Sequence, residues 1–171
     1  MSEALLIARL ILGLGLAAHG AQKLFGWFGG PGPKGMAGFM AGMNLRPPML
    51  FGLAAGLGEF GGGLLIALGF LGGIGPGLLV VVMLTAILTV HWGKGFFVAG
   101  NGWELPGTYI AGALAIDFAG FGVYSIDKVL GWSILGTDAD RWIILGVAVV
   151  IALLNSSMRF LPRPASAPAA K

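Results

Sequence analysis

The chain has 171 residues, of which 57% are hydrophobic and only 10% charged, and its formal net charge is +3. A water-soluble domain of this length has too little interior to hide so much apolar surface, so the composition indicates an integral membrane protein. The small, scattered positive charge argues against nucleic acid as a partner. The absence of cysteine excludes a disulfide, a CxxC redox centre and thiolate ligation of a metal or iron–sulfur cluster by this chain.

Five apolar segments approach the roughly 20 residues that a helix needs to cross about 30 Å of hydrocarbon. We predict an all-α bundle in the lipid bilayer, with four core transmembrane helices, a fifth C-terminal helix, and one short interfacial or re-entrant helix. The first segment lacks a basic leader and is a full span, so we expect no cleaved signal peptide. The predicted spans are residues 4–25, 48–70, 76–97, 103–121 and 141–160.

The segment between the first two spans, residues 28–47, is too long for a simple turn. One apolar helical face recurs in it at positions i, i+3, i+4 and i+7, namely Met36, Phe39, Met40 and Met43. We therefore expect the interfacial or re-entrant helix here, in a position to cap one end of the bundle.

The C-terminal third has two helix signals and a biased tail. Residues 137–140, Thr-Asp-Ala-Asp, resemble a capping box at the start of the fifth span. The tail is rich in Pro and Ala, which predicts disorder. The predicted organisation is a four-helix bundle over residues 1–130, an additional transmembrane helix over 131–160, and a disordered tail over 161–171.

Glycines are abundant, with 32 in the chain, and several lie one helical turn apart. Gly52 and Gly56, and Gly58 and Gly62, would let helix backbones approach closely in a membrane. Packing within the bundle is the simplest explanation, and oligomerisation through these faces is the alternative.

The basic residues are distributed unevenly between the two ends of a five-span bundle. Seven of the ten fall at the end that holds the C-terminus, namely Lys23, Lys34, Arg46, Lys94, Arg159, Arg163 and Lys171. The positive-inside rule then predicts an external N-terminus and a cytoplasmic tail.

Glu59 is the only charged residue between Pro47 and Pro76, and it lies near the middle of the second span. An ionised group in hydrocarbon costs about 3 kcal/mol or more, so such a residue normally faces a partner, a cavity or a ligand. Glu59 is therefore the first candidate for a functional site.

Two histidines fall at a depth similar to each other. His19 and His91 each lie about five residues past the middle of spans that run in the same direction, which places both roughly 7 Å toward the basic end. Lys23 follows His19 by four residues and shares its helix face. We predict a polar pocket in this half of the bundle that also includes Gln22 and Glu104.

Each of these residues also has a structural explanation. The histidines could hydrogen-bond to Glu59 or to a backbone carbonyl and thereby join helices, and Lys23 could extend to the headgroups. Trp92 and its aromatic neighbours fit either an interfacial belt or the mouth of a site for a flat ligand. Asp117 and Asp127 lie toward the other end, where we expect helix-end or loop charges.

An ordered set of short motifs over about residues 5–128 resembles the DoxX family of small prokaryotic membrane proteins. The family typically has four helices, so the fifth span is a departure from its pattern. The motifs are Arg9-Leu10, residues 19–26 (HGAQKLFG), residues 59–62 (EFGG), His91-Trp92, residues 95–97 (GFF), residues 102–104 (GWE) and residues 124–127 (YSID).

The resemblance implies a role in redox chemistry at a prokaryotic plasma (inner) membrane. Relatives form the membrane part of a thiosulfate:quinone oxidoreductase, and others are linked to oxidative-stress complexes. The first hypothesis is therefore a quinone-binding subunit, in which Glu59, His19 and His91 handle protons and Gln22, Lys23, Trp92 and Glu104 help to bind the quinone. Its electrons would come from a redox partner subunit, because the chain has no redox motif of its own.

Two other functions are compatible with the residues. A non-enzymatic scaffold or small-solute carrier would use the buried polar cluster to set helix register or to form a translocation site. A b-type haem held between His19 and His91 is a further alternative, because their matched depth permits two axial ligands. No ligand pair with the spacing of a metal site occurs, so we predict no other metal.

Overall fold

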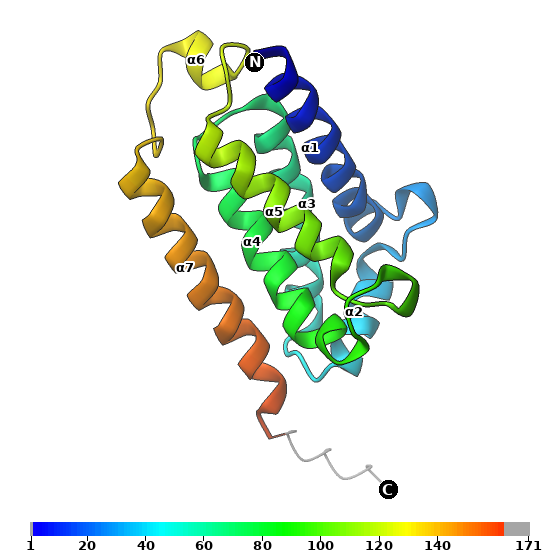
Figure 1. Ribbon diagram of the computed structural model, residues 1–171. Coiled ribbons are helices and arrows are strands. Elements are labelled where there is room, and N and C mark those ends of the chain that lie inside the picture. Colours follow the sequence, from blue (N-terminus) through cyan, green and yellow to red (C-terminus); the bar gives the residue numbers. More distant parts are fainter. Residues whose placement is uncertain (1, 163–171) are drawn as a thin grey trace, which may run out of the picture.

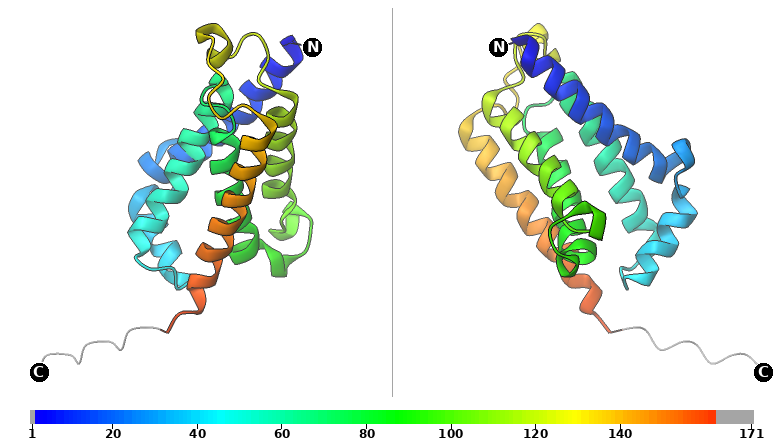
Figure 2. Two further views of the ribbon diagram at one scale, coloured as in Figure 1. Left: turned by 90° about the vertical axis from the view of Figure 1, so that its left-hand side faces the viewer. Right: turned by 45° about the vertical axis from the view of Figure 1, so that its right-hand side comes forward.

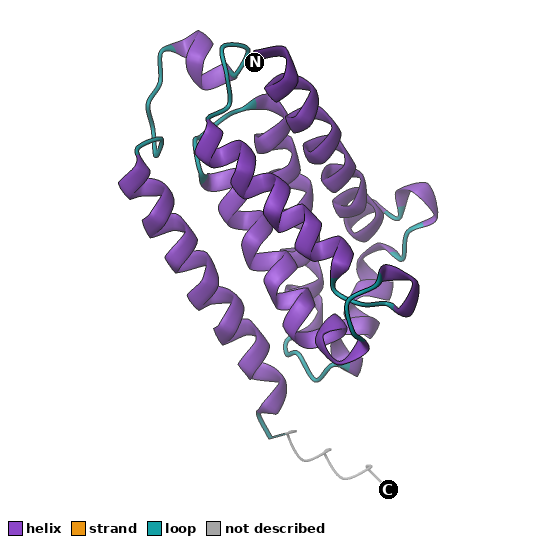
Figure 3. Ribbon diagram, in the orientation of Figure 1, coloured by secondary structure: helices purple, strands orange, loops and turns teal. Residues whose placement is uncertain are grey.

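The computed structural model describes residues 2–162, and over these residues all the regular structure is helical (Figure 3). This confirms the predicted all-α class. Of the predicted disordered tail, residues 163–171 lie outside the described residues. The α-helices are α1 (Ser2–Phe25), α2 (Gly32–Gly42), α3 (Pro48–Leu68), α4 (Ile74–Ala86), α5 (Glu104–Ala119), α6 (Ile126–Leu130) and α7 (Asp138–Ser157).

Helices α1, α3, α4, α5 and α7 lie side by side and form the body of the bundle, with α7 at its margin against α4 (Figures 1 and 2). Within residues 2–162, four helical segments are long and apolar enough to cross a membrane. The chain is therefore a multi-pass membrane protein. The four segments are Glu3–Phe25, Pro48–Leu68, Ile74–Lys94 and Asp138–Phe160.

Helix α5 is shorter than the span predicted for it. Its 16 residues rise about 24 Å, less than the roughly 30 Å of a typical hydrocarbon core. The helix ends at Gly120, whose φ of 81° leaves the helical region. Even so, α5 packs against α1 and α4, and so it supplies side chains to the middle of the bundle.

The third predicted span is helical but not uniformly α-helical. After Ala86 the chain forms a π-helical turn, Ile87–His91, and then a short 3₁₀ turn, Trp92–Lys94. Single π turns within α-helices are frequently found at functional sites. This one carries His91.

The predicted helix between the first two spans is α2, which packs against α3. Met36 and Met40 are buried, whereas Phe39 is half exposed. The predicted apolar face is therefore only partly buried. At Gly52 of α3, a Cβ atom would lie 3.1 Å from Cβ of Met36, so the two helices are in close contact.

Glycines allow α1 and α3 to meet backbone to backbone. A Cβ atom added to either Gly13 or Gly63 would lie 2.5 Å from the carbonyl oxygen of the other, closer than real Cβ atoms come. Gly58 and Gly62 similarly face Val82 and Leu78 of α4. Packing within the chain therefore accounts for these glycines, as the simpler of the two explanations predicted.

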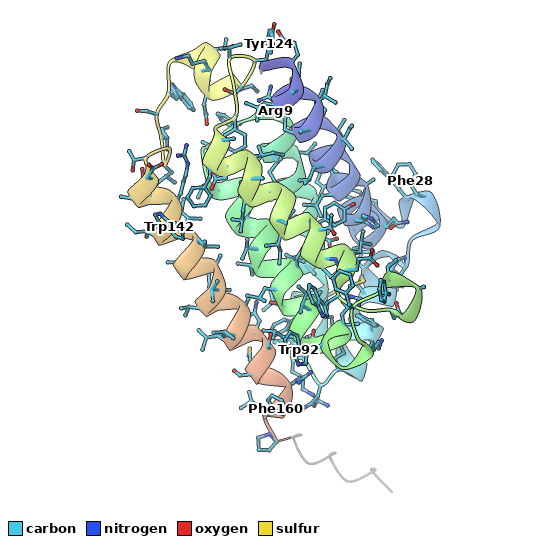
Figure 4. All side chains as sticks on the ribbon, in the orientation of Figure 1. Arg9, Phe28, Trp92, Tyr124, Trp142 and Phe160 are labelled. Atoms are coloured by element: carbon cyan, nitrogen blue, oxygen red, sulfur yellow. The ribbon has the colours of Figure 1, made fainter. Side chains whose placement is uncertain are left out.

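Arg9, 2% exposed, joins three parts of the chain at the end of the bundle that holds the N-terminus (Figure 4). Its guanidinium donates hydrogen bonds to the carbonyls of Leu68, in the last turn of α3, and Tyr124, before α6. The guanidinium can come this close to the end of α3 only because residue 69 is glycine, since a Cβ atom there would clash with Nη1 of Arg9. Gly69 also has a φ of 62°, which favours glycine.

The two carboxylates predicted as helix-end or loop charges differ from each other. Asp127 accepts hydrogen bonds from the backbone N–H groups of Leu71 and Gly72, at 3.0 and 2.8 Å, and holds the turn between α3 and α4. Asp117 lies in the last turn of α5, as a helix-end charge should, but it is buried. It faces Arg141 of α7, with Oδ1 3.6 Å from Nε, so it helps attach α7 to the bundle.

Candidate functional site

The centre of the site is an ion pair between Lys23 in the last turn of α1 and Glu59 in the middle of α3. Glu59 is 3% exposed and Lys23 is partly exposed, so the pair forms where water is scarce. The ammonium group contacts Oε1 of the carboxylate. Oε2 is buried and has no hydrogen-bond partner among the described residues. A buried carboxylate oxygen without a donor is costly, and a ligand with a donor group would satisfy it.

The ion pair borders a cavity of about 230 Å³. Helices α1, α3, α4 and α5 and the loop before α5 all contribute to its walls. The structure therefore brings four of the predicted site residues together from three separate helices. The lining residues are His19, Lys23, Glu59, Met83, Ala86, His91, Val98, Asn101, Gly102, Leu105, Pro106 and Tyr109.

The two histidines reach this cavity in different ways. Nδ1 of His91 lies 2.7 Å from the carbonyl oxygen of Asn101, so this nitrogen carries a proton and donates. That bond anchors the ring to the loop before α5. His19 is exposed, and its ring meets the ring of Tyr109 edge to face, with centroids 6.1 Å apart. His19 and Tyr109 thus link α1 to α5 at an open side of the cavity.

Three of the predicted site residues do not line the cavity. Gln22 donates to the carbonyl of Phe28, 3.3 Å away, because the chain folds back just after α1. Glu104 begins α5, but its Oε2 accepts from the backbone N–H of Val98 at 2.8 Å and fixes the preceding loop. Trp92 is 66% exposed, since it follows the π turn and faces outward.

Two lining residues were not among those predicted, Asn101 and Tyr109. Asn101 lies in the loop before α5 and was hidden because loop conformation cannot be read from periodicity. Tyr109 could have been found from the sequence, since it is the only tyrosine within a predicted span. Its amphipathic ring needs a polar neighbour when buried, and here it faces the polar cavity.

Metal binding has little support within residues 2–162. No three His, Asp or Glu side chains in this part of the chain are grouped closely enough to hold a metal ion. The polar groups that do converge are an ammonium, a carboxylate, two imidazoles, an amide and a phenol. Such a set can donate and accept hydrogen bonds and can transfer protons.

Comparison with known proteins identifies one match. The model of the DoxX family matches residues 4–92, which include His19, Lys23, Glu59 and His91. Asn101 and Tyr109 lie beyond the matched residues, as do α5 and α7. No curated protein and no solved structure matches the chain.

Proposed function

The chain belongs to the DoxX family, and from this membership and the polar cavity we propose that it is a quinone-binding subunit of a redox complex in a prokaryotic plasma membrane. In this proposal the cavity holds the quinone ring, this chain manages its protons, and a partner subunit delivers electrons. A role in oxidative-stress chemistry is one form that such a complex takes in the family.

The observation that carries the proposal is the unpartnered Oε2 of Glu59 beside the Lys23 ammonium. A quinone ring offers two carbonyl acceptors, and its reduced form offers two hydroxyl donors. Lys23 supplies a donor for the first form, and Oε2 supplies an acceptor for the second. One buried ion pair thus has a hydrogen-bonding group for each redox state.

Converting a quinone to a quinol takes up two electrons and two protons. The chain has no cysteine and no redox motif, so the electrons are assigned to a partner subunit. Glu59 is the group best placed to pass protons, because it is buried at the cavity wall and paired with a cation that can also exchange a proton. His19, at the exposed side of the cavity, connects this pair with the surroundings.

The first experiment is solvent extraction of the purified protein, followed by mass spectrometry and an absorption spectrum. We expect stoichiometric quinone from the wild-type chain and saturable binding of menadione, a quinone without a tail, in lipid nanodiscs. A chain that yields no quinone and does not bind menadione contradicts the proposal and favours the scaffold or carrier. A Soret band would favour the bis-histidine haem.

The second experiment compares Glu59→Gln with Glu59→Leu. If Glu59 passes protons, the Gln variant keeps its expression and thermal stability but loses the proton exchange that accompanies binding of reduced menadione. Calorimetry in two buffers of different ionisation enthalpy measures that exchange. A purely structural Glu59 predicts instead that Gln is tolerated and Leu is not. If both variants match the wild type, neither role holds.

A further inference from the structure

A second cavity, of about 520 Å³, lies next to the polar one and is more than twice as large. Its walls come from α2, α3 and α4, with contributions from the ends of α1 and α7. They are mostly apolar, and the volume falls in the range of sites for ligands of tens of atoms. The main apolar lining residues are Met36, Phe39, Met40, Met43, Leu45, Phe51, Ala54, Ala55, Val81, Val82, Ala86 and Val90.

The two cavities meet along a shared wall. Lys23, Ala86, His91 and Asn101 line both of them. A molecule that occupied both cavities would place its polar end beside the Lys23–Glu59 pair and its apolar part on the far side of this wall. The chemistry of the two cavities suits an amphiphile with a compact polar head and a flexible apolar tail.

Methionines give the larger cavity an adaptable wall. Three of them belong to α2 or its end, and their unbranched side chains can rearrange around a flexible or branched guest. The facing wall has the small residues Ala54 and Ala55 on α3, which leave room for it. This combination suits a methyl-branched polyisoprenoid chain.

The end of α7 contributes to the wall of this cavity, and the residues that follow α7 are held by hydrogen bonds. Asn155 lines the cavity, and Met158 packs on the buried cluster of Met36, Met40 and Leu45. Nδ2 of Asn44 donates to the carbonyls of Arg159 and Leu161, at 2.8 and 3.0 Å.

The short turn after α7, Met158–Phe160, is also bonded to the π turn. Arg159 donates to the carbonyl of Thr89, at 3.4 Å, within the turn that carries His91. The helix beyond the family match is thereby joined to both cavities.

We infer that the apolar cavity binds the first isoprenoid units of the quinone tail, and that α7 completes its wall. The inference rests on the proposed function, because the ring must occupy the polar cavity for its tail to enter this one. It specifies the substrate class as quinones with a polyisoprenoid tail and assigns a role to the fifth long helix.

The test uses two probes, menadione and a menaquinone with two isoprenoid units, each titrated in the same lipid nanodiscs. Ala55→Phe fills the cavity from α3, and Ala111→Phe adds the same side chain to an exposed position of α5 as the control. We expect Ala55→Phe to lower the ratio of tailed to tail-free affinity at least tenfold. The control should leave the ratio within twofold, because Ala111 does not line the cavity. Partition of the probes into lipid is the same for every variant, so it cancels when the ratios are compared.

Asn155→Phe fills the same cavity from α7 and replaces Ala55→Phe should that variant not fold. It should produce the same loss of preference for the tailed probe. An unchanged ratio in the filled variants, with menadione still bound, overturns the tail site but leaves the proposed function standing. Wild-type protein that binds neither probe overturns both.

Discussion

Arg9 and Glu59 are buried almost equally, at 2% and 3% exposure, but their surroundings differ. Arg9 lies at the N-terminal end of the bundle, where backbone carbonyls of α3 and of the loop before α6 accept from its guanidinium. Glu59 lies beside a cavity, with one oxygen on Lys23 and the other without a donor. Burial alone therefore does not distinguish a structural charge from a candidate functional one. Each residue leaves one buried atom without a partner, Nε of Arg9 and Oε2 of Glu59, but of the two residues only Glu59 lines one of the cavities described above.

The largest effect expected from this comparison is on stability, in Arg9→Leu. Losing charged hydrogen bonds to two carbonyls should lower the free energy of unfolding by about 3 kcal/mol. Thermal unfolding in detergent measures the loss. Menadione affinity of the folded protein should not change, because Arg9 does not line the cavity. Unaltered stability would contradict the structural role assigned to Arg9.

A smaller loss of stability is expected where α1 meets α3. Gly63→Ala places a methyl group 2.5 Å from the carbonyl oxygen of Gly13, and overpacking of this kind costs about 1–3 kcal/mol. Gly61→Ala is the matched control, since nothing lies within 4 Å of a Cβ atom at that position of the same helix. The two variants should therefore differ in unfolding midpoint, with Gly63→Ala the lower. Equal midpoints would show that the helices can separate at no cost.

The smallest effect concerns the cavity itself. Tyr109→Phe removes a hydroxyl from its lining, and the loss of one hydrogen bond of about 1 kcal/mol weakens menadione binding about fivefold. Trp92→Phe serves as the comparison, because Trp92 is exposed and lies outside the cavity. Titration in nanodiscs measures both. A stronger effect from Trp92→Phe would instead favour a site whose mouth is lined by Trp92 and its aromatic neighbours, one of the two roles that the sequence left open for them.

Helix geometry was enough to predict the centre of the site. His19 and His91 reach one cavity because parallel helices of known rise place residues at predictable depths. Glu59 could be predicted because an ionised carboxylate within an apolar span is costly unless it faces a partner or a cavity, whatever the details of the packing. The pairing of Glu59 with Lys23 follows from the same need for a partner, although the sequence did not single out which cation would provide it.

The remaining members of the site depend on features that periodicity does not encode. Gln22 and Glu104 have the predicted depth, but local turns direct both side chains to backbone groups. Asn101 and Tyr109 enter the cavity only because the loop before α5 folds back onto His91 and α5 packs on α1.

The π turn that follows α4 has a consequence for aligning this chain with its relatives. A turn closed by i→i+5 bonds contains one residue more than a regular α-helical turn needs, and each residue of a helix advances about 100° around the axis. A homologue with a regular helix here would be one residue shorter, and its gap belongs inside Ile87–His91. If the gap is placed elsewhere, His91 is aligned with a residue that lies on a different side of the homologue's helix. A histidine that the homologue does have at the equivalent position would then be missed.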